Sequence, residues 1–161
     1  MHVRDFENDD WTDVWPIFDS VVSRGDTYAL PRVWESEAAF RAWAQQPSFR
    51  VFVAVEADSI VGTAKLGPNR DGPGSHVATA SFMVAPNARG LGVGRALGEH
   101  VLEQAKGAGF SAMQFNAVVE TNLAAIALWE SLGFRVVGTV PDGFELPDGD
   151  RVGLHIMHRH L

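Results

Sequence analysis

The sequence has 161 residues and a net charge of −7 with histidine neutral, and 46% of its residues are hydrophobic. This size and ordinary composition predict a single domain over residues 1–161 with a real core, rather than a disordered chain. The lack of cysteine excludes disulfides, thiolate nucleophiles and cysteine-ligated metals. The acidic balance, the scattered basic residues and the lack of a long apolar run argue against nucleic-acid and membrane partners. We therefore expect a cytoplasmic protein.

The first half of the chain predicts a strand, two helices and three further strands. Asn8 to Asp10 offer N-caps for the first helix, whose apolar residues recur at helical spacing from Trp11 to Val22. A loop rich in Gly, Pro, Asn and Asp is expected over 67–75, before the last of these strands. The expected elements are strand 2–6, helix 11–22, helix 35–46, and strands 49–55, 60–66 and 76–85.

The second half alternates helices and strands and then ends in two strands. Asp142-Gly143 and the segment 147–150 are typical of turns between the last two strands. The expected elements are helix 90–107, strand 111–119, a helix from Thr121 or Asn122 to Leu132, and strands 134–140 and 152–160. The resulting order, β-α-α-β-β-β-α-β-α-β-β, predicts an α/β fold in which helices cover both faces of a mixed sheet.

Three alternating glycines stand between a strand and a helix, in Arg89-Gly90-Leu91-Gly92-Val93-Gly94-Arg95. Glycine permits positive φ and leaves space, so backbone N–H groups can converge on an anion beside the positive end of the helix. The pattern indicates a pyrophosphate site. A dinucleotide fingerprint would need glycine where Arg95 or Leu97 stands, and the P-loop Gly-Lys-Ser/Thr is missing. The alternative is that these glycines serve only a tight turn.

This glycine segment resembles the acyl-CoA signature of GCN5-related N-acetyltransferases (GNAT). A second motif of that family is similar to the residues Asn122, Ala125, Leu128, Gly133 and Phe134. The resemblance implies a GNAT fold, with a mostly antiparallel seven-stranded sheet splayed between its fourth and fifth strands. It also implies acetyl-CoA as co-substrate, no metal, and a β-bulge around 81–85 that turns backbone groups toward the pantetheine. The implied cofactor-binding residues are Met83, Val84, Ala85, Arg89, Gly90, Leu91, Gly92, Val93, Gly94, Arg95, Asn122 and Trp129.

A narrower resemblance lies in the segments 114–122 and 126–134. They are similar to fungal L-azetidine-2-carboxylate N-acetyltransferases and to phosphinothricin-type small-molecule acetyltransferases. Two active-site asparagines of the fungal group match Asn116 and Asn122. The resemblance therefore implies direct acetyl transfer to a small-molecule amine, with amino and imino acids among the candidates. Homodimerisation stays open.

The acid and base of such a reaction are not evident in the sequence. Trp129 stands where the family often has a tyrosine acid, and Tyr28 is the only tyrosine. The strand 77–84 has no carboxylate, which leaves Glu120, acting through water, or His76 as candidate bases. A catalytically silent acetyl-CoA-binding module and a protein acetyltransferase are therefore the alternatives.

Two further groups of residues invite a functional reading. Trp34 and Trp43 could line a substrate pocket near the second helix. His158 and His160 share one face of the last strand while His155 lies on the other, so we expect no metal there.

Overall fold

A computed structural model describes residues 1–161, and its seven strands form one sheet in the order β1-β2-β3-β4-β5-β7-β6. All neighbouring strands are antiparallel except β4 and β5, which are parallel. The predicted fold class is confirmed. The main elements are β1 (His2–Asp5), α1 (Trp11–Ser23), α2 (Ser36–Ala44), β2 (Arg50–Glu56), β3 (Ser59–Pro68), β4 (Val77–Val84), α3 (Val93–Gly107), β5 (Ala112–Val119), α4 (Leu123–Ser131), β6 (Arg135–Glu145) and β7 (Arg151–His160).

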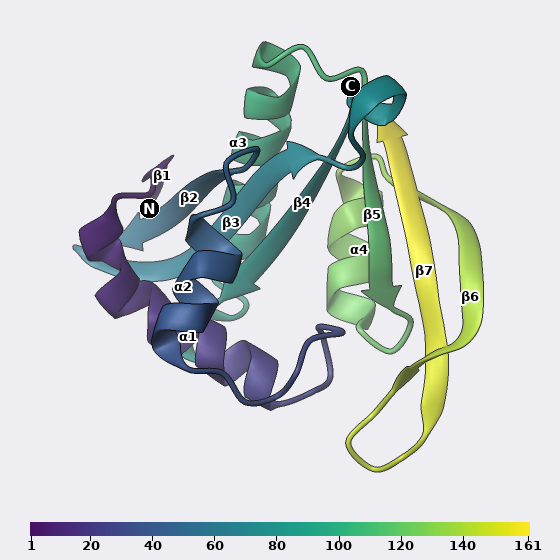
Figure 1. Cartoon of the computed structure of the whole chain (residues 1–161), viewed down its shortest axis with the longest axis horizontal. Coiled ribbons are helices and arrows are strands. Elements are labelled where there is room, and N and C mark those ends of the chain that lie inside the picture. Colours follow the sequence, from purple (N-terminus) through teal and green to yellow (C-terminus); the bar gives the residue numbers. More distant parts are fainter.

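Helices cover both faces of the sheet, with α1 and α2 on one face and α3 and α4 on the other (Figure 1). Each long helix buries one apolar stripe, as its sequence spacing predicts. On α3 the buried stripe includes Val93, Leu97 and Val101, and on α1 it includes Val14 and Phe18. None of the helices has the length and apolar character needed to cross a membrane.

The sheet opens between β4 and β5, as expected. These strands pair only at Val77–Ala112 and Ala78–Met113, and beyond that point they diverge (Figure 1). Along β4 the pairing with β3 is regular, from Pro68–Ala78 to Gly62–Val84. The β-bulge expected around 81–85 is therefore absent, because regular pairing with β3 leaves no extra residue in β4. The gap arises instead because β5 turns away.

The bulge next to the gap lies in β5. Phe115 pairs with Met157 and Val118 with His155, so one extra residue is accommodated in β5 between these two pairs. A bulge bends its strand and re-aims the side chains within it. In β5 those side chains belong to Asn116 and Ala117.

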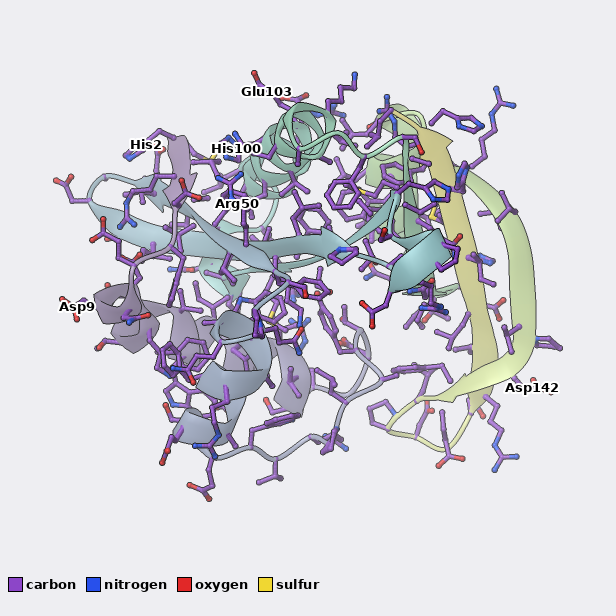
Figure 2. The ribbon with its side chains drawn as sticks, turned by 45° about the horizontal axis from the view of Figure 1, so that its top comes forward. His2, Asp9, Arg50, His100, Glu103 and Asp142 are labelled. Carbon is purple, nitrogen blue, oxygen red and sulfur yellow. The ribbon has the colours of Figure 1, made fainter.

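Two element boundaries differ from the sequence expectation. The helix α3 begins at Val93 rather than Gly90, because Gly90 and Gly92 have left-handed φ values of +79° and +83° that a helix cannot contain. The strand β6 continues to Glu145, through the Asp142-Gly143 pair that was expected to be a turn. Asp142 has φ +52° at an irregularity in the β6–β7 pairing, and it lies at the bend of β6 (Figure 2). The pair bends the strand without ending it.

Candidate active site

Two cavities meet where the sheet opens. The first, of about 600 Å³, runs along the glycine segment and the start of α3, and we call it the groove. The second, of about 410 Å³, lies between the sheet, α2 and the 27–30 loop, and we call it the inner cavity. Both are bordered by Thr27, Phe82, Asn122, Ala125 and Trp129. A molecule in the groove can therefore reach a molecule in the inner cavity.

The groove is built to receive an anion at the glycine segment. A Cβ placed on Gly90 or Gly92 would meet no heavy atom within 4 Å, so both backbones face open space. Gly92 is the N-cap of α3, and the first turn of that helix contains no acidic residue. Unpaired N–H groups at a helix N-terminus carry partial positive charge. Arg95 adds a full charge, and its guanidinium also donates to Ser131 Oγ at 2.8 Å.

Most of the residues predicted to bind the cofactor border this groove. Two do not. The N–H of Ala85 donates to Val61 O at 2.9 Å and the side chain is buried, while Leu91 is 67% exposed outside the groove. Neither residue borders the groove, so their expected cofactor contacts stay predictions. Those that border it are Met83, Val84, Arg89, Gly90, Gly92, Val93, Gly94, Arg95, Asn122 and Trp129.

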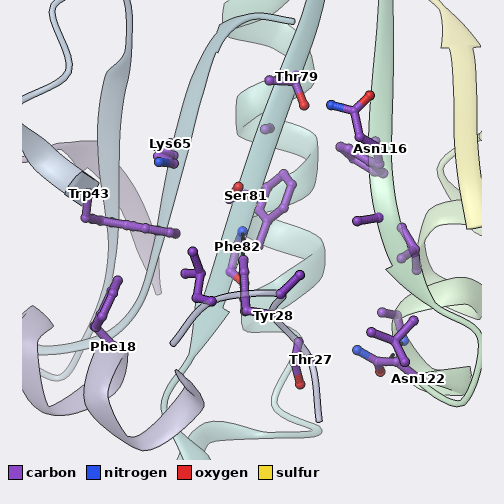
Figure 3. A pocket seen from close by; sticks show the side chains of 18 of the residues that line it. Phe18, Thr27, Tyr28, Trp43, Lys65, Thr79, Ser81, Phe82, Asn116 and Asn122 are labelled. Carbon is purple, nitrogen blue, oxygen red and sulfur yellow. Dashed lines mark hydrogen bonds between the residues drawn. The ribbon is translucent and has the colours of Figure 1, made fainter. Parts of the chain in front are cut away.

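The backbone of β4 presents hydrogen-bonding groups to the gap. Tyr28 Oη donates to Phe82 O at 2.7 Å and accepts from Phe82 N at 2.9 Å, so both groups point away from β3 (Figure 3). The backbone N–H and C=O groups of successive residues in a strand point alternately to its two sides. Val84, two residues after Phe82, therefore also directs its N–H and C=O away from β3, toward the gap. Burial raises the pKa of the Tyr28 hydroxyl, which keeps it protonated.

An aromatic cluster walls the junction of the two cavities. The Trp129 ring lies 4.7 Å from that of Phe82 and 4.9 Å from that of Phe115, measured between centroids. Trp129 is 7% exposed. The residue that stands in place of the family's tyrosine therefore contributes an apolar wall.

The two predicted asparagines lie on the β5 side of the inner cavity (Figure 3). Asn116 donates from Nδ2 to Asn69 Oδ1 at 2.6 Å and accepts from Gln114 Nε2 at 2.9 Å. Asn122 caps α4, with Oδ1 accepting from Ala125 N at 3.3 Å. Each amide oxygen accepts one hydrogen bond. Asn116 uses one of its two N–H groups to bond to Asn69, so Asn116 keeps one N–H and Asn122 keeps two for a ligand.

The candidate bases lie elsewhere, and neither borders the groove or the inner cavity. A Cβ added to Gly153 of β7 would come within 2.5 Å of Glu120 Oε2, so this carboxylate lies against β7. His76 Nδ1 lies 3.0 Å from Pro73 O, in an exposed loop. Trp34 and Trp43 do border the inner cavity, as predicted. Among the C-terminal histidines, His158 and His160 have ring centroids 5.0 Å apart and His155 bonds to Thr139, so the three do not converge.

Lys65 on β3 is a charged residue of the inner cavity that the sequence reasoning missed. Its ammonium donates to Ala42 O at 3.2 Å and lies 5.1 Å from the Trp43 ring centroid. Burial lowers the pKa of Lys65. A signal existed in the sequence, because Lys65 interrupts the uncharged strand Ile60–Leu66.

Residues 4–134 match the model of the acetyltransferase (GNAT) family. The chain belongs to this family. A GNAT structure from Kribbella flavida is 53% identical, with a TM-score of 0.94, and covers 99% of this chain and 97% of its own. The structure of YncA, a putative acetyltransferase from Salmonella typhimurium, contains acetyl-CoA; it is 25% identical, with a TM-score of 0.88, over 100% of this chain and 94% of its own.

Curated relatives of this GNAT chain match only in part. N-acetyltransferase aca1 of Schizosaccharomyces pombe is 38% identical over 88 residues, which is 55% of this chain and 42% of aca1. The chain thus spans less than half the length of the curated relatives that it matches. Two solved structures, a phosphinothricin acetyltransferase from Sinorhizobium meliloti and a putative phosphinothricin N-acetyltransferase, are 24% and 23% identical, which shows the shared fold alone.

Proposed function

We propose that this GNAT-family enzyme transfers an acetyl group from acetyl-CoA to the amine of a small amino or imino acid. The observation that carries the proposal is the inner cavity, about 410 Å³ in volume and open to the groove at Phe82. Small-molecule sites commonly range from about 300 to 1,000 Å³. The walls contributed by Trp34, Trp43 and Phe18 favour a compact acceptor over a long chain.

The groove fits the pyrophosphate and pantetheine of acetyl-CoA. Gly90, Gly92 and the N-terminus of α3 would hold the two phosphates, with Arg89 and Arg95 supplying cations. The N–H and C=O of Val84 would bind the amide groups of the pantetheine, and the free amide N–H of Asn122 would support the arm. When bound, acetyl-CoA supplies the acetyl group as a thioester.

The inner cavity favours the neutral form of the acceptor amine. Its walls are mostly apolar, and its only full charge is the cation of Lys65. Desolvation among these walls disfavours an ammonium ion, which shifts the acceptor amine toward its neutral, nucleophilic form. No carboxylate or histidine borders the cavity, so the proton leaves to water. Tyr28 stays protonated and holds the Phe82 backbone in place.

Asn116 would position the acceptor, and its substitution tests the proposal. The Asn116 side chain is exposed in the free protein, and a bound acceptor would cover it. Asn116→Ala removes this amide donor from the complex, which costs about 1–3 kcal/mol, so acceptor kcat/KM should fall about ten- to a hundredfold. The matched control is Gln114→Ala. Gln114 bonds to Asn116 Oδ1 but does not border the cavity, so this variant should keep acceptor kcat/KM within about threefold of the wild type. The acetyl-CoA KM should change little in both variants.

The acceptor panel decides between functions. It comprises azetidine-2-carboxylate, proline analogues, ordinary amino acids, peptides and polyamines, with thiol release from acetyl-CoA as the signal. Efficient acetylation of peptides alone would replace the proposal by a protein acetyltransferase. Binding of acetyl-CoA with no thiol release on any acceptor would indicate a silent binding module.

A further inference from the structure

We propose that Lys65 determines acceptor specificity by binding a carboxylate, so that the enzyme selects amines that carry one. The inference rests on the proposed function, since it concerns the acceptor of that same cavity. Lys65 lies outside both sequence motifs. Its support is the charge of the cavity, the contacts of the ammonium and the cost of burying it without a counter-ion.

Lys65 is the only charged residue that borders the inner cavity. The other polar side chains there are hydroxyls and amides, among them Ser81, Thr79 and Asn116 (Figure 3). No carboxylate lies within 4 Å of the Lys65 ammonium. A cavity with one unbalanced cation attracts an anion and repels polycationic amines.

The surroundings of the ammonium hold it without neutralising it. It lies 5.1 Å from the ring centroid of Trp43 and 5.3 Å from that of Phe49. Its one hydrogen bond goes to Ala42 O at 3.2 Å. The cross-strand neighbours of Lys65, Val51 on β2 and Ser81 on β4, carry no charge. Since an ammonium has three N–H donors, two remain for a ligand.

A purely structural role explains these contacts poorly. A methionine would fill the same space beside Trp43 without the cost of removing a charge from water. That cost is visible in the pKa of Lys65, which burial lowers. A bound carboxylate would offset it by pairing with the ammonium in partly desolvated surroundings, where charge-assisted hydrogen bonds are strong.

The position of Lys65 also suits an acceptor whose amine must reach the groove. Lys65 pairs with Ser81, the residue before Phe82, whose backbone marks the junction of the two cavities. Asn116 lies across the gap on β5 (Figure 3). An α-amino or imino acid would thus pair its carboxylate with Lys65 on one wall and meet the Asn116 amide on the other.

The test compares a carboxylate acceptor with its uncharged carboxamide. The acceptor is the best amino or imino acid of the panel above, assayed with its carboxamide on wild type, Lys65→Met, Lys65→Gln and Lys65→Arg. Lys106→Met is the matched control, because Lys106 is the only other lysine and lies exposed at the end of α3. Thermal midpoints establish that each variant folds, and Lys65→Gln replaces Lys65→Met if the latter does not.

We expect Lys65→Met to lower kcat/KM for the carboxylate about ten- to a hundredfold, mainly through KM, as loss of a charged hydrogen bond does. For the carboxamide, kcat/KM of Lys65→Met should stay within about threefold of the wild-type value. Lys65→Arg should keep part of the preference for the carboxylate over the carboxamide, and Lys106→Met should have the kcat/KM values of the wild type. Calorimetric binding of the N-acetylated product should weaken by the same factor in Lys65→Met.

Two results would overturn the inference. If Lys65→Met lowers carboxylate and carboxamide turnover equally, or changes neither, Lys65 does not bind the carboxylate, while the proposed function stands. If the wild type acetylates neither acceptor nor any small amine, the proposed function fails and the inference fails with it.

Discussion

Gly92 and Gly109 provide a matched pair for testing whether the groove binds acetyl-CoA. Their φ values are +83° and +85°, and a Cβ on either would meet no heavy atom within 4 Å. A side chain at either position therefore imposes the same left-handed backbone strain, about 1–2 kcal/mol, without a clash. Their places differ, because Gly92 borders the groove at the N-terminus of α3 and Gly109 follows the C-terminus of that helix.

The perturbation is Gly92→Glu, with Gly109→Glu as control. Without cofactor both variants should be destabilised to a similar extent, and Gly92→Glu somewhat less, since a carboxylate at a helix N-terminus is favourable. In the presence of acetyl-CoA the stabilities of the two variants should diverge. A carboxylate at position 92 stands where the phosphates are expected, and it adds bulk and like charge there.

The magnitude follows from the coupling of ligand binding to folding. Acetyl-CoA at a hundred times its Kd stabilises a folded protein by about 2.7 kcal/mol. For a chain of this size each kcal/mol raises Tm by about 2–4 °C, so the expected shift is about 5–11 °C. Gly109→Glu should keep this shift, and Gly92→Glu should lose most of it. Thermal melts with and without acetyl-CoA measure both, and equal shifts in the two variants would refute the assignment of the groove.

Two other predictions concern the cofactor and the stability of the fold. Arg89→Ala should raise the KM for acetyl-CoA more than it lowers kcat, because Arg89 would hold ground state and transition state alike; a fall in kcat alone would contradict its place at the phosphates. Arg4 donates to both oxygens of Asp10, at 2.7 and 2.8 Å, and lowers the pKa of that carboxyl. The ion pair therefore stabilises the folded protein fully at pH values above the pKa that Asp10 has in the unfolded chain. This stabilisation is lost as the pH falls through the lower pKa that Asp10 has in the folded protein. Asp10→Asn should therefore lower the free energy of unfolding by about 1 kcal/mol at pH 7. In denaturant titrations this difference should shrink in acid, and one that persists there would contradict the ion-pair explanation.

The order of elements and the glycine turn before α3 could be predicted because their signals are local. Helical and strand periodicity lie within single segments, and the glycine segment is contiguous from Arg89 to Arg95. The end of β6 was mispredicted for the same reason. Asp142 and Gly143 are residue types that favour a turn, but β6 pairs with β7 both before and after them. The strand therefore bends at this pair and continues.

The inner cavity could not be predicted from patterns within single segments of the sequence. It combines Trp43 from α2, Lys65 from β3, Tyr28 from a loop and Asn116 from β5, which are far apart in sequence. Lys65 stands out in the sequence as the one charge in its strand, but its place in a cavity becomes visible only once α2 is placed over it. The direction of Asn116 depends on a bulge defined by pairing with β7, and no pattern within β5 reveals that bulge.

The period of two along β4 divides its side chains between the two faces of the sheet and its backbone groups between β3 and the gap. Residues 79, 81 and 83 direct their backbone groups to β3, which leaves the side chains of Thr79 and Ser81 facing the inner cavity. Residues 82 and 84 direct their backbone groups to the gap, and their side chains face the opposite layer, where Phe82 contacts Trp129. A slip of one residue would exchange the two sets. Regular pairing with β3 through Gly62–Val84 thus fixes which side chains of β4 face each layer and which backbone groups stay free at the gap.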